Sequence, residues 1–182
     1  MDFNSAFESG FSYDEFLDKY GSEQEKSAWQ GVYSRVTVSE SQQQLLASFV
    51  RELRVLCMAG AWCGDCVSQC PIFRKIEEAC PNIKLRFVDR DANPELAAEL
   101  KICGGSRVPQ VVFMSEDGKP IGRNGDRTLA KYRQMMGEVA GAVLPSPAEN
   151  LLDAVTQDWL NEFERVQYIL RLSPSLRQKH GD

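Results

Sequence analysis

A Cys-x-x-Cys pair lies where an unbroken apolar run meets the start of a predicted helix, and this junction constrains the fold more than any other feature. Residues 54–59 read Arg-Val-Leu-Cys-Met-Ala, without the alternation of a half-buried strand. Such a run is typical of a strand covered on both faces. After Gly60, residues 63–79 carry a helical pattern that begins with Cys63 and Cys66. We therefore predict two thiols at the start of a helix that directly follows a central strand.

The segments after this junction predict an α/β fold. Residues 83–88 read as a second strand, which completes a strand–helix–strand unit with an expected right-handed crossover. A short helix is expected over 93–100, opened by Pro94 at a tolerated first-turn position. Residues 110–114 and 120–123 flank an Asp-Gly pair, which is typical of an antiparallel hairpin. The predicted result is a mixed sheet of four to five strands flanked by helices.

Helical patterns also lie on both sides of this sheet. Residues 13–20 and 39–53 precede it, with Ser39 as a candidate cap for the second helix. Residues 128–140 are expected to form a helix that covers the sheet, and an apolar stripe over 151–170 predicts a longer one that packs within the chain. The helices near the N-terminus are expected to be short and peripheral.

These patterns predict four parts of the chain, defined by composition and by a Pro-rich linker at residues 144–147. They are an acidic helical N-terminal extension (1–37), a central domain (38–144), a C-terminal amphipathic helix packing on that domain (145–172) and a flexible, polar tail (173–182).

Charge and the chain start exclude several classes of protein. A net charge of −5 and a pI near 5.1 argue against nucleic acid or an anionic membrane as a partner, because both require a basic face. The N-terminus lacks the pattern of a signal peptide, and no stretch approaches 18 apolar residues. We therefore expect a soluble, cytoplasmic protein. Thiols in that compartment stay reduced, so the six cysteines are not expected to form stabilising disulfide bonds.

The position of the two thiols predicts their chemistry. Free amide groups and the helix dipole stabilise a thiolate at the start of a helix, so the pKa of Cys63 is expected to be lowered. Cys66 lies one turn further on, where it can attack a mixed disulfide on Cys63 and release the reduced substrate. Cys63 is thus the predicted nucleophile and Cys66 the predicted resolving thiol.

Trp62-Cys63-Gly64-Asp65-Cys66 resembles the active-site motif of the thioredoxin family. Pro71 stands where the family has a helix-kinking proline, and Val108-Pro109 is similar to its active-site cis-proline. The resemblance covers roughly residues 38–141 and implies a thioredoxin-like fold with thiol-disulfide oxidoreductase activity.

The family resemblance also implies how substrate is bound. It places Trp62 beside the nucleophile, lets the backbone of Val108 pair with a substrate strand, and makes Pro109 shape the groove. The implied partners are a disulfide-containing protein or small molecule and an upstream reductant, either a reductase or a small thiol. No cofactor, metal, nucleic acid or membrane partner is expected.

Two departures from the family pattern are expected to modulate the site, together with Gly64 between the cysteines. Cys57 stands where the family commonly has a buried acid, and the lysine that partners this acid is replaced by Phe87. Asp65 replaces the usual proline. A carboxylate there opposes the helix-terminus effect, which favours a more reducing dithiol.

Two alternatives to an enzyme remain open at this stage. Cys63, Cys66 and Cys70, with Cys57 as a fourth ligand, could hold zinc or an iron-sulfur cluster. The chain could also be a thioredoxin-like interaction scaffold without turnover. The simplest interpretation of Cys57, Cys70, Cys80 and Cys103 is that they are small apolar side chains that pack in the core and have no chemical role.

Overall fold

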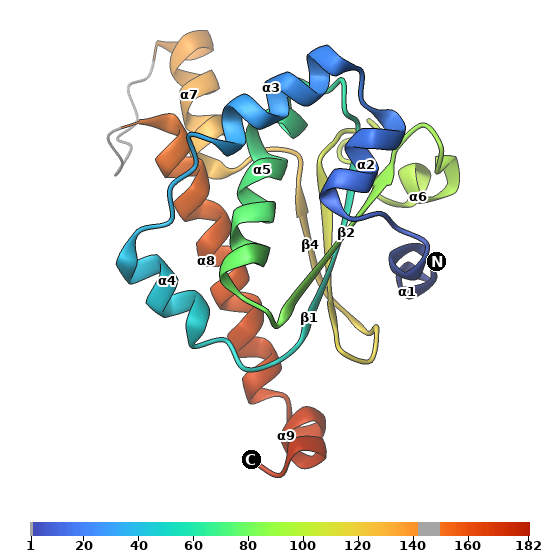
Figure 1. Cartoon of the computed structure of the whole chain (residues 1–182), viewed down its shortest axis with the longest axis vertical. Coiled ribbons are helices and arrows are strands. Elements are labelled where there is room, and N and C mark those ends of the chain that lie inside the picture. The colour runs from blue at the N-terminus through green and yellow to red at the C-terminus, as the bar shows by residue number, and fades with distance from the viewer. Residues whose placement is uncertain (1, 142–149) are drawn as a thin grey trace.

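The computed structural model describes residues 2–141 and 150–182, and its centre is a mixed four-stranded sheet (Figure 1). The strand order is β2-β1-β3-β4. The central β1 runs parallel to β2 and antiparallel to β3, and β4 is antiparallel to β3. The predicted fold class is confirmed. The strands are β1 (Leu53–Ala59), β2 (Ile83–Asp89), β3 (Gln110–Ser115) and β4 (Pro120–Gly125).

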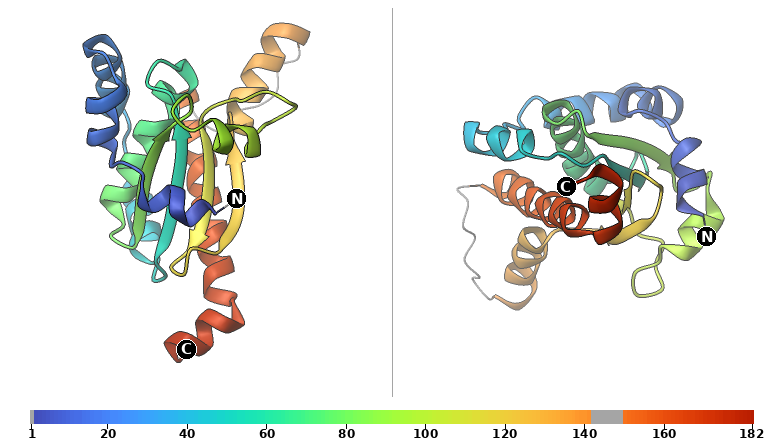
Figure 2. Two further views of the ribbon diagram at one scale, coloured as in Figure 1. Left: turned by 90° about the vertical axis from the view of Figure 1, so that its right-hand side faces the viewer. Right: turned by 90° about the horizontal axis from the view of Figure 1, so that it is seen from below.

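Helices cover both faces of the sheet. Helices α5 and α8 lie on one face, and α1 and α6 lie on the other (Figure 2). This explains why β1 is apolar without alternation, since six of its seven residues are buried. The helices are α1 (Phe3–Glu8), α2 (Tyr13–Tyr20), α3 (Glu23–Tyr33), α4 (Glu40–Ala47), α5 (Gly64–Ala79), α6 (Pro94–Glu99), α7 (Leu129–Ala140), α8 (Leu151–Leu172) and α9 (Pro174–His180).

Helix α4 is shorter than predicted. Ser39 caps it as expected and forms a capping box with Gln42. The helix ends at Ala47, however, and Leu53 belongs to β1. The intervening chain is held differently, because both backbone polar groups of Arg51 hydrogen-bond to the side chain of Gln167 on α8. This distant partner could not be seen in the local pattern.

Helix α8, and not α7, covers the sheet, which corrects the prediction for residues 128–140. Only Ala130 of α7 is buried, whereas α8 buries an extended stripe against α5 and the sheet. Trp159 packs edge-on against Phe73 of α5 with ring centroids 4.6 Å apart, and Phe163 packs edge-on against Phe113 of β3 at 5.3 Å. The apolar stripe of α8 is wider than that of α7 and buries more apolar area, which explains why α8 is the helix that covers the sheet.

The N-terminal helices are part of the core, so the prediction that they are peripheral is wrong. Phe16 and Trp29 are fully buried. Both pack against Phe87 of β2, with centroids 5.5 and 6.4 Å away. Burying two large aromatic side chains outweighs the acidic composition of this segment.

Residues 173–182, expected to form a flexible tail, contain helix α9. Its last turn contacts the hairpin between β3 and β4, where Lys179 and His180 lie 2.6 and 2.9 Å from the Glu116 carboxylate. Leu176 is buried, and Asp182 pairs with the buried Arg51. These long-range contacts order a segment whose own composition is polar.

None of the described helices combines the length and apolar character needed to cross a bilayer. The boundary predicted between residues 144 and 145, with its Pro-rich linker, lies outside the described residues.

Candidate active site

Sheet register brings the two predicted halves of the site together. Met58, next to the end of β1, pairs with Gln110 at the start of β3. The loop after β1 therefore lies beside the residues before β3. The Val108-Pro109 peptide bond is cis, as the resemblance implies, and the Cys63 thiol donates to the Val108 carbonyl at 3.5 Å.

The two thiols differ in exposure, and this difference separates their roles. Cys63 is the N-cap residue of α5, and its carbonyl accepts the first helical hydrogen bond from Val67 at 2.9 Å. Its side chain is partly exposed, whereas Cys66 is fully buried. The Gly60 amide donates to the Cys66 sulfur at 3.5 Å. A disulfide arriving from solvent therefore meets Cys63 first.

The two thiols are coupled, and their pKa values are shifted in opposite directions. The hydrogen bond to Cys66 raises the pKa of the Cys63 thiol, and burial adds to this effect. Burial also acts to raise the pKa of Cys66, but hydrogen bonds from Cys63, Cys70 and the Gly60 amide outweigh it and lower this pKa to about 5. The two thiols therefore titrate as one coupled pair that shares a proton.

Trp62 forms an exposed platform beside Cys63. Its side chain is 49% exposed, and the guanidinium of Arg90 lies 4.5 Å from the ring centroid. Glycine at position 60 makes room for the ring, because a Cβ there would lie 2.8 Å from it. The buried indole of Trp29 also donates to the Ala61 carbonyl at 2.9 Å, so the N-terminal helices support this loop.

An acid–base cluster that the sequence did not reveal lies next to the dithiol. Arg127, just after β4, contacts the Asp65 carboxylate at 2.6 Å and the buried Asp126 carboxylate at 3.2 Å. Arg107 contacts Asp126 at 3.1 Å, and Tyr132 also donates to it. Asp65 is therefore not an isolated negative charge. In the sequence, the cluster is visible only as the pair Asp126-Arg127 directly after a predicted strand. Such a pair is common in solvated loops and does not by itself indicate a site.

We expect Arg127→Gln to move the pH profile of dithiol alkylation upward by up to about one unit, because the uncompensated Asp65 carboxylate raises the first pKa of the pair. At pH values below that pKa, the alkylation rate should fall by up to about tenfold. The measurement is the rate of iodoacetamide modification of Cys63 against pH. Asp65→Asn combined with Arg127→Gln should restore the rate. Arg123→Gln, an exposed arginine on β4, is the control. Unchanged profiles in all variants would contradict this coupling.

Asp126 gives a pH-dependent contribution to stability. Burial acts to raise its pKa, but hydrogen bonds from Tyr132 and Arg107 outweigh burial, so the pKa of Asp126 is lowered. Its stabilisation is therefore present above the unfolded-state pKa and is lost as the pH falls through the lower folded-state pKa. We expect Asp126→Asn to reduce the free energy of unfolding by about 1–3 kcal/mol at pH 7 and by less below pH 4. Urea unfolding across this range measures it, and a pH-independent difference would contradict it.

The position of the family's buried acid holds a thiol, as the sequence showed. Cys57 on β1 is fully buried and pairs with Phe87 on β2, so the expected alignment of these two positions agrees with the register. Burial raises the pKa of the Cys57 thiol. Cys57 and Phe87 therefore supply neither the carboxylate nor the amine that the family commonly has at these two positions for proton transfer.

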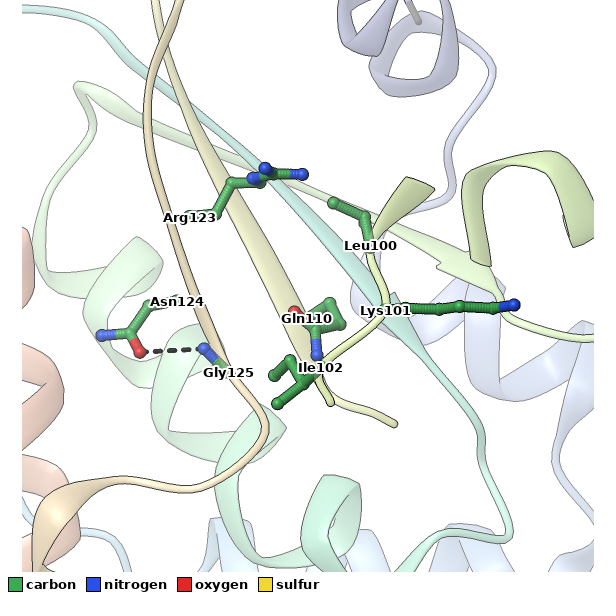
Figure 3. Close-up of a pocket in the computed structure, with 7 residues that line it drawn as sticks. All are labelled: Leu100, Lys101, Ile102, Gln110, Arg123, Asn124 and Gly125. Carbon is green, nitrogen blue, oxygen red and sulfur yellow. Dashed lines mark hydrogen bonds between the residues drawn. The ribbon is translucent and has the colours of Figure 1, made fainter. Parts of the chain in front are cut away.

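A metal centre and a ligand pocket are the two other kinds of site to consider. Within residues 2–141 and 150–182, no three His, Cys, Asp or Glu side chains are arranged to hold a metal ion. A pocket of about 360 Å³ lies beside Gln110, immediately after Pro109 (Figure 3). In the described part of the chain, its lining contains no cysteine: Leu100, Lys101, Ile102, Gln110, Arg123, Asn124 and Gly125. The dithiol therefore does not line this pocket.

Comparisons with known proteins identify the family of the chain. The family model described as thioredoxin matches residues 10–140. The chain is 30% identical over 111 residues to the chloroplastic thioredoxin X of Arabidopsis thaliana, covering 59% of this chain and 54% of that protein. It spans about half the length of the curated relatives it matches.

Similarity to a Pseudomonas aeruginosa structure supports the overall fold. A Pseudomonas aeruginosa protein of unknown function aligns with a TM-score of 0.73 at 19% identity, over 91% of this chain and 99% of that one. A Fasciola hepatica thioredoxin aligns at 26% identity over 53% of this chain and 88% of that one, with a TM-score of 0.37. Since the family model covers well over half of the sequence, the chain belongs to the thioredoxin family.

Proposed function

We propose that the protein is a thiol-disulfide oxidoreductase that reduces disulfides of proteins or small molecules through a Cys63/Cys66 cycle. Membership of the thioredoxin family supports thiol oxidoreductase chemistry in general. The observation that carries the specific proposal is the partly exposed Cys63 at the start of α5, whose thiol donates to the Val108 carbonyl and is coupled to the buried Cys66.

The cycle has two exchange steps. Cys63 loses its proton, and its thiolate attacks one sulfur of the substrate disulfide, releasing the other as a thiolate that takes up a proton. Cys66 then loses its proton and attacks the Cys63 sulfur. This breaks the mixed disulfide, releases the second substrate thiol and leaves the Cys63–Cys66 disulfide. Two electrons have moved to the substrate.

Neighbouring residues have proposed roles in binding. Trp62 offers an apolar platform to the segment that carries the disulfide. Pro109 shapes the groove next to Cys63. The backbone of Val108 pairs with an extended substrate strand in place of its contact with Cys63. Gly64, Asp65 and Cys57 modulate the dithiol, Asp65 together with Arg127.

An external donor must return the two electrons, because the cycle leaves the protein oxidised. We propose a reductase or a small thiol in the cytoplasm for this step. Since Asp65 is paired with Arg127, its effect on the reduction potential is smaller than an unpaired carboxylate would give.

A Cys66→Ser variant tests the order of attack. Without the resolving thiol, the mixed disulfide on Cys63 should accumulate, and mass spectrometry should find it there. Cys63→Ser should accumulate none at Cys66, because that sulfur is buried. Equal trapping on both variants would contradict the assigned roles.

A further inference from the structure

Two more thiols continue inward from the dithiol. Cys70 lies one turn after Cys66 on the same helix, α5, and the two thiols are close enough to shift each other's pKa. On the other side, the Cys70 sulfur lies 4.0 Å from the sulfur of Cys57 on β1. Cys57, Cys66 and Cys70 are all fully buried. Four sulfurs therefore form a continuous path from the partly exposed Cys63 to the centre of the core.

We propose that Cys57 and Cys70 are a second redox-active dithiol, which re-reduces the Cys63–Cys66 disulfide by internal exchange. The proposal rests on the proposed function, since that cycle generates the disulfide to be reduced. It assigns a redox role to Cys57 and Cys70, which exchange no electrons in the Cys63/Cys66 cycle.

The exchange needs no additional reactant. Cys70 loses its proton and attacks the Cys66 sulfur, which forms a Cys66–Cys70 bond and releases Cys63 as a thiolate that takes up a proton. Cys57 then loses its proton and attacks the Cys70 sulfur, which forms a Cys57–Cys70 bond and releases Cys66. Two thiols become a disulfide, and one disulfide becomes two thiols. The fully reduced protein can thus reduce two substrate disulfides before a donor is required.

The distance between the Cys57 and Cys70 sulfurs and the burial of both thiols are expected to slow the internal exchange. The sulfurs of Cys57 and Cys70 must approach by about 2 Å to reach a bond length near 2.05 Å. Burial raises the pKa of both thiols, so the reactive thiolate is scarce. The internal exchange should therefore be slower than oxidation of Cys63 and Cys66, and it should accelerate as the pH rises.

Thiol counting tests the proposal on the full chain. The exposed Cys103 is replaced by serine to prevent side reactions. The reduced protein is incubated with excess oxidised glutathione at pH 8.5, denatured and treated with N-ethylmaleimide. Intact mass then counts the free thiols, and fragmentation of disulfide-linked peptides identifies the pairs.

The parent with five cysteines should retain one free thiol, that of Cys80, with Cys63–Cys66 and Cys57–Cys70 as the linked pairs. Cys70→Ala and Cys57→Val should each lose only the second disulfide and retain two free thiols. Cys80→Ala is the matched control, because it also removes a buried cysteine. It should form both disulfides and retain no free thiol. Thermal unfolding of each variant checks that it is folded.

Other counts overturn the proposal in distinguishable ways. Three free thiols in the parent, with only Cys63 and Cys66 linked, would refute the second dithiol and leave the proposed function intact. A parent with a stable Cys66–Cys70 pair would refute the transfer to Cys57. Five free thiols would show that Cys63 and Cys66 do not oxidise, which would overturn the proposed function itself.

Discussion

Replacing Cys63 with serine is expected to lower disulfide-reducing turnover by about 1,000-fold or more, the scale of loss seen when a catalytic nucleophile is removed. A hydroxyl is not ionised near neutral pH and does not attack a disulfide, whereas a thiolate does. Among the described residues, Cys66, Cys57 and Cys70 are buried and cannot replace Cys63 as the attacking group. The measurement is steady-state reduction of a protein disulfide, with dithiothreitol as donor.

Cys80→Ala is the control for this experiment. Cys80 ends α5 at the opposite end from the dithiol and is buried. Its replacement should leave turnover within about twofold, since it removes one sulfur without touching the site. Equal rates for Cys63→Ser, Cys80→Ala and the parent protein would instead favour a scaffold without turnover.

Truncating Trp159 to alanine is expected to lower the free energy of unfolding by about 3–5 kcal/mol, as for other fully buried tryptophans. The side chain packs edge-on against Phe73, and its indole donates to the Gln69 side chain at 2.9 Å. Its loss leaves a cavity between α8 and α5 and removes the hydrogen bond. Urea unfolding of the full chain measures the effect.

The matched control is Tyr168→Ala on the same helix. Tyr168 is 52% exposed, so its loss should cost less than about 1 kcal/mol. Trp159→Phe should lie between the two, because it keeps part of the apolar contact and loses the hydrogen bond. If Trp159→Ala and Tyr168→Ala cost the same, α8 does not stabilise the fold through this face.

The packing of α8 is linked to the candidate site through Gln69. This side chain accepts from Trp159 and donates to the Asp126 carbonyl at 2.8 Å. Asp126 in turn contacts Arg127, the partner of Asp65. The C-terminal helix therefore supports the residues next to the dithiol as well as covering the sheet.

The sequence alone determined the strand–helix–strand unit and the position of the dithiol within it. The reason is that these features are local: β1 is apolar throughout, α5 begins immediately after it, and Cys63 and Cys66 are separated by one helical turn. The cis Val108-Pro109 bond was anticipated through the family motif. The coupling of the two thiol pKa values was not, since it depends on the neighbours of each thiol.

Only the tertiary structure decided how distant segments complete the site and the core. Arg127 meets Asp65 because β4 ends beside the start of α5, and Trp29 supports the loop before Cys63. Residues 173–182 become ordered through partners elsewhere in the chain, such as Arg51 and Glu116. Such contacts join residues far apart in sequence, and no local periodicity or propensity encodes them. They form only when the sheet order brings the ends of its strands together.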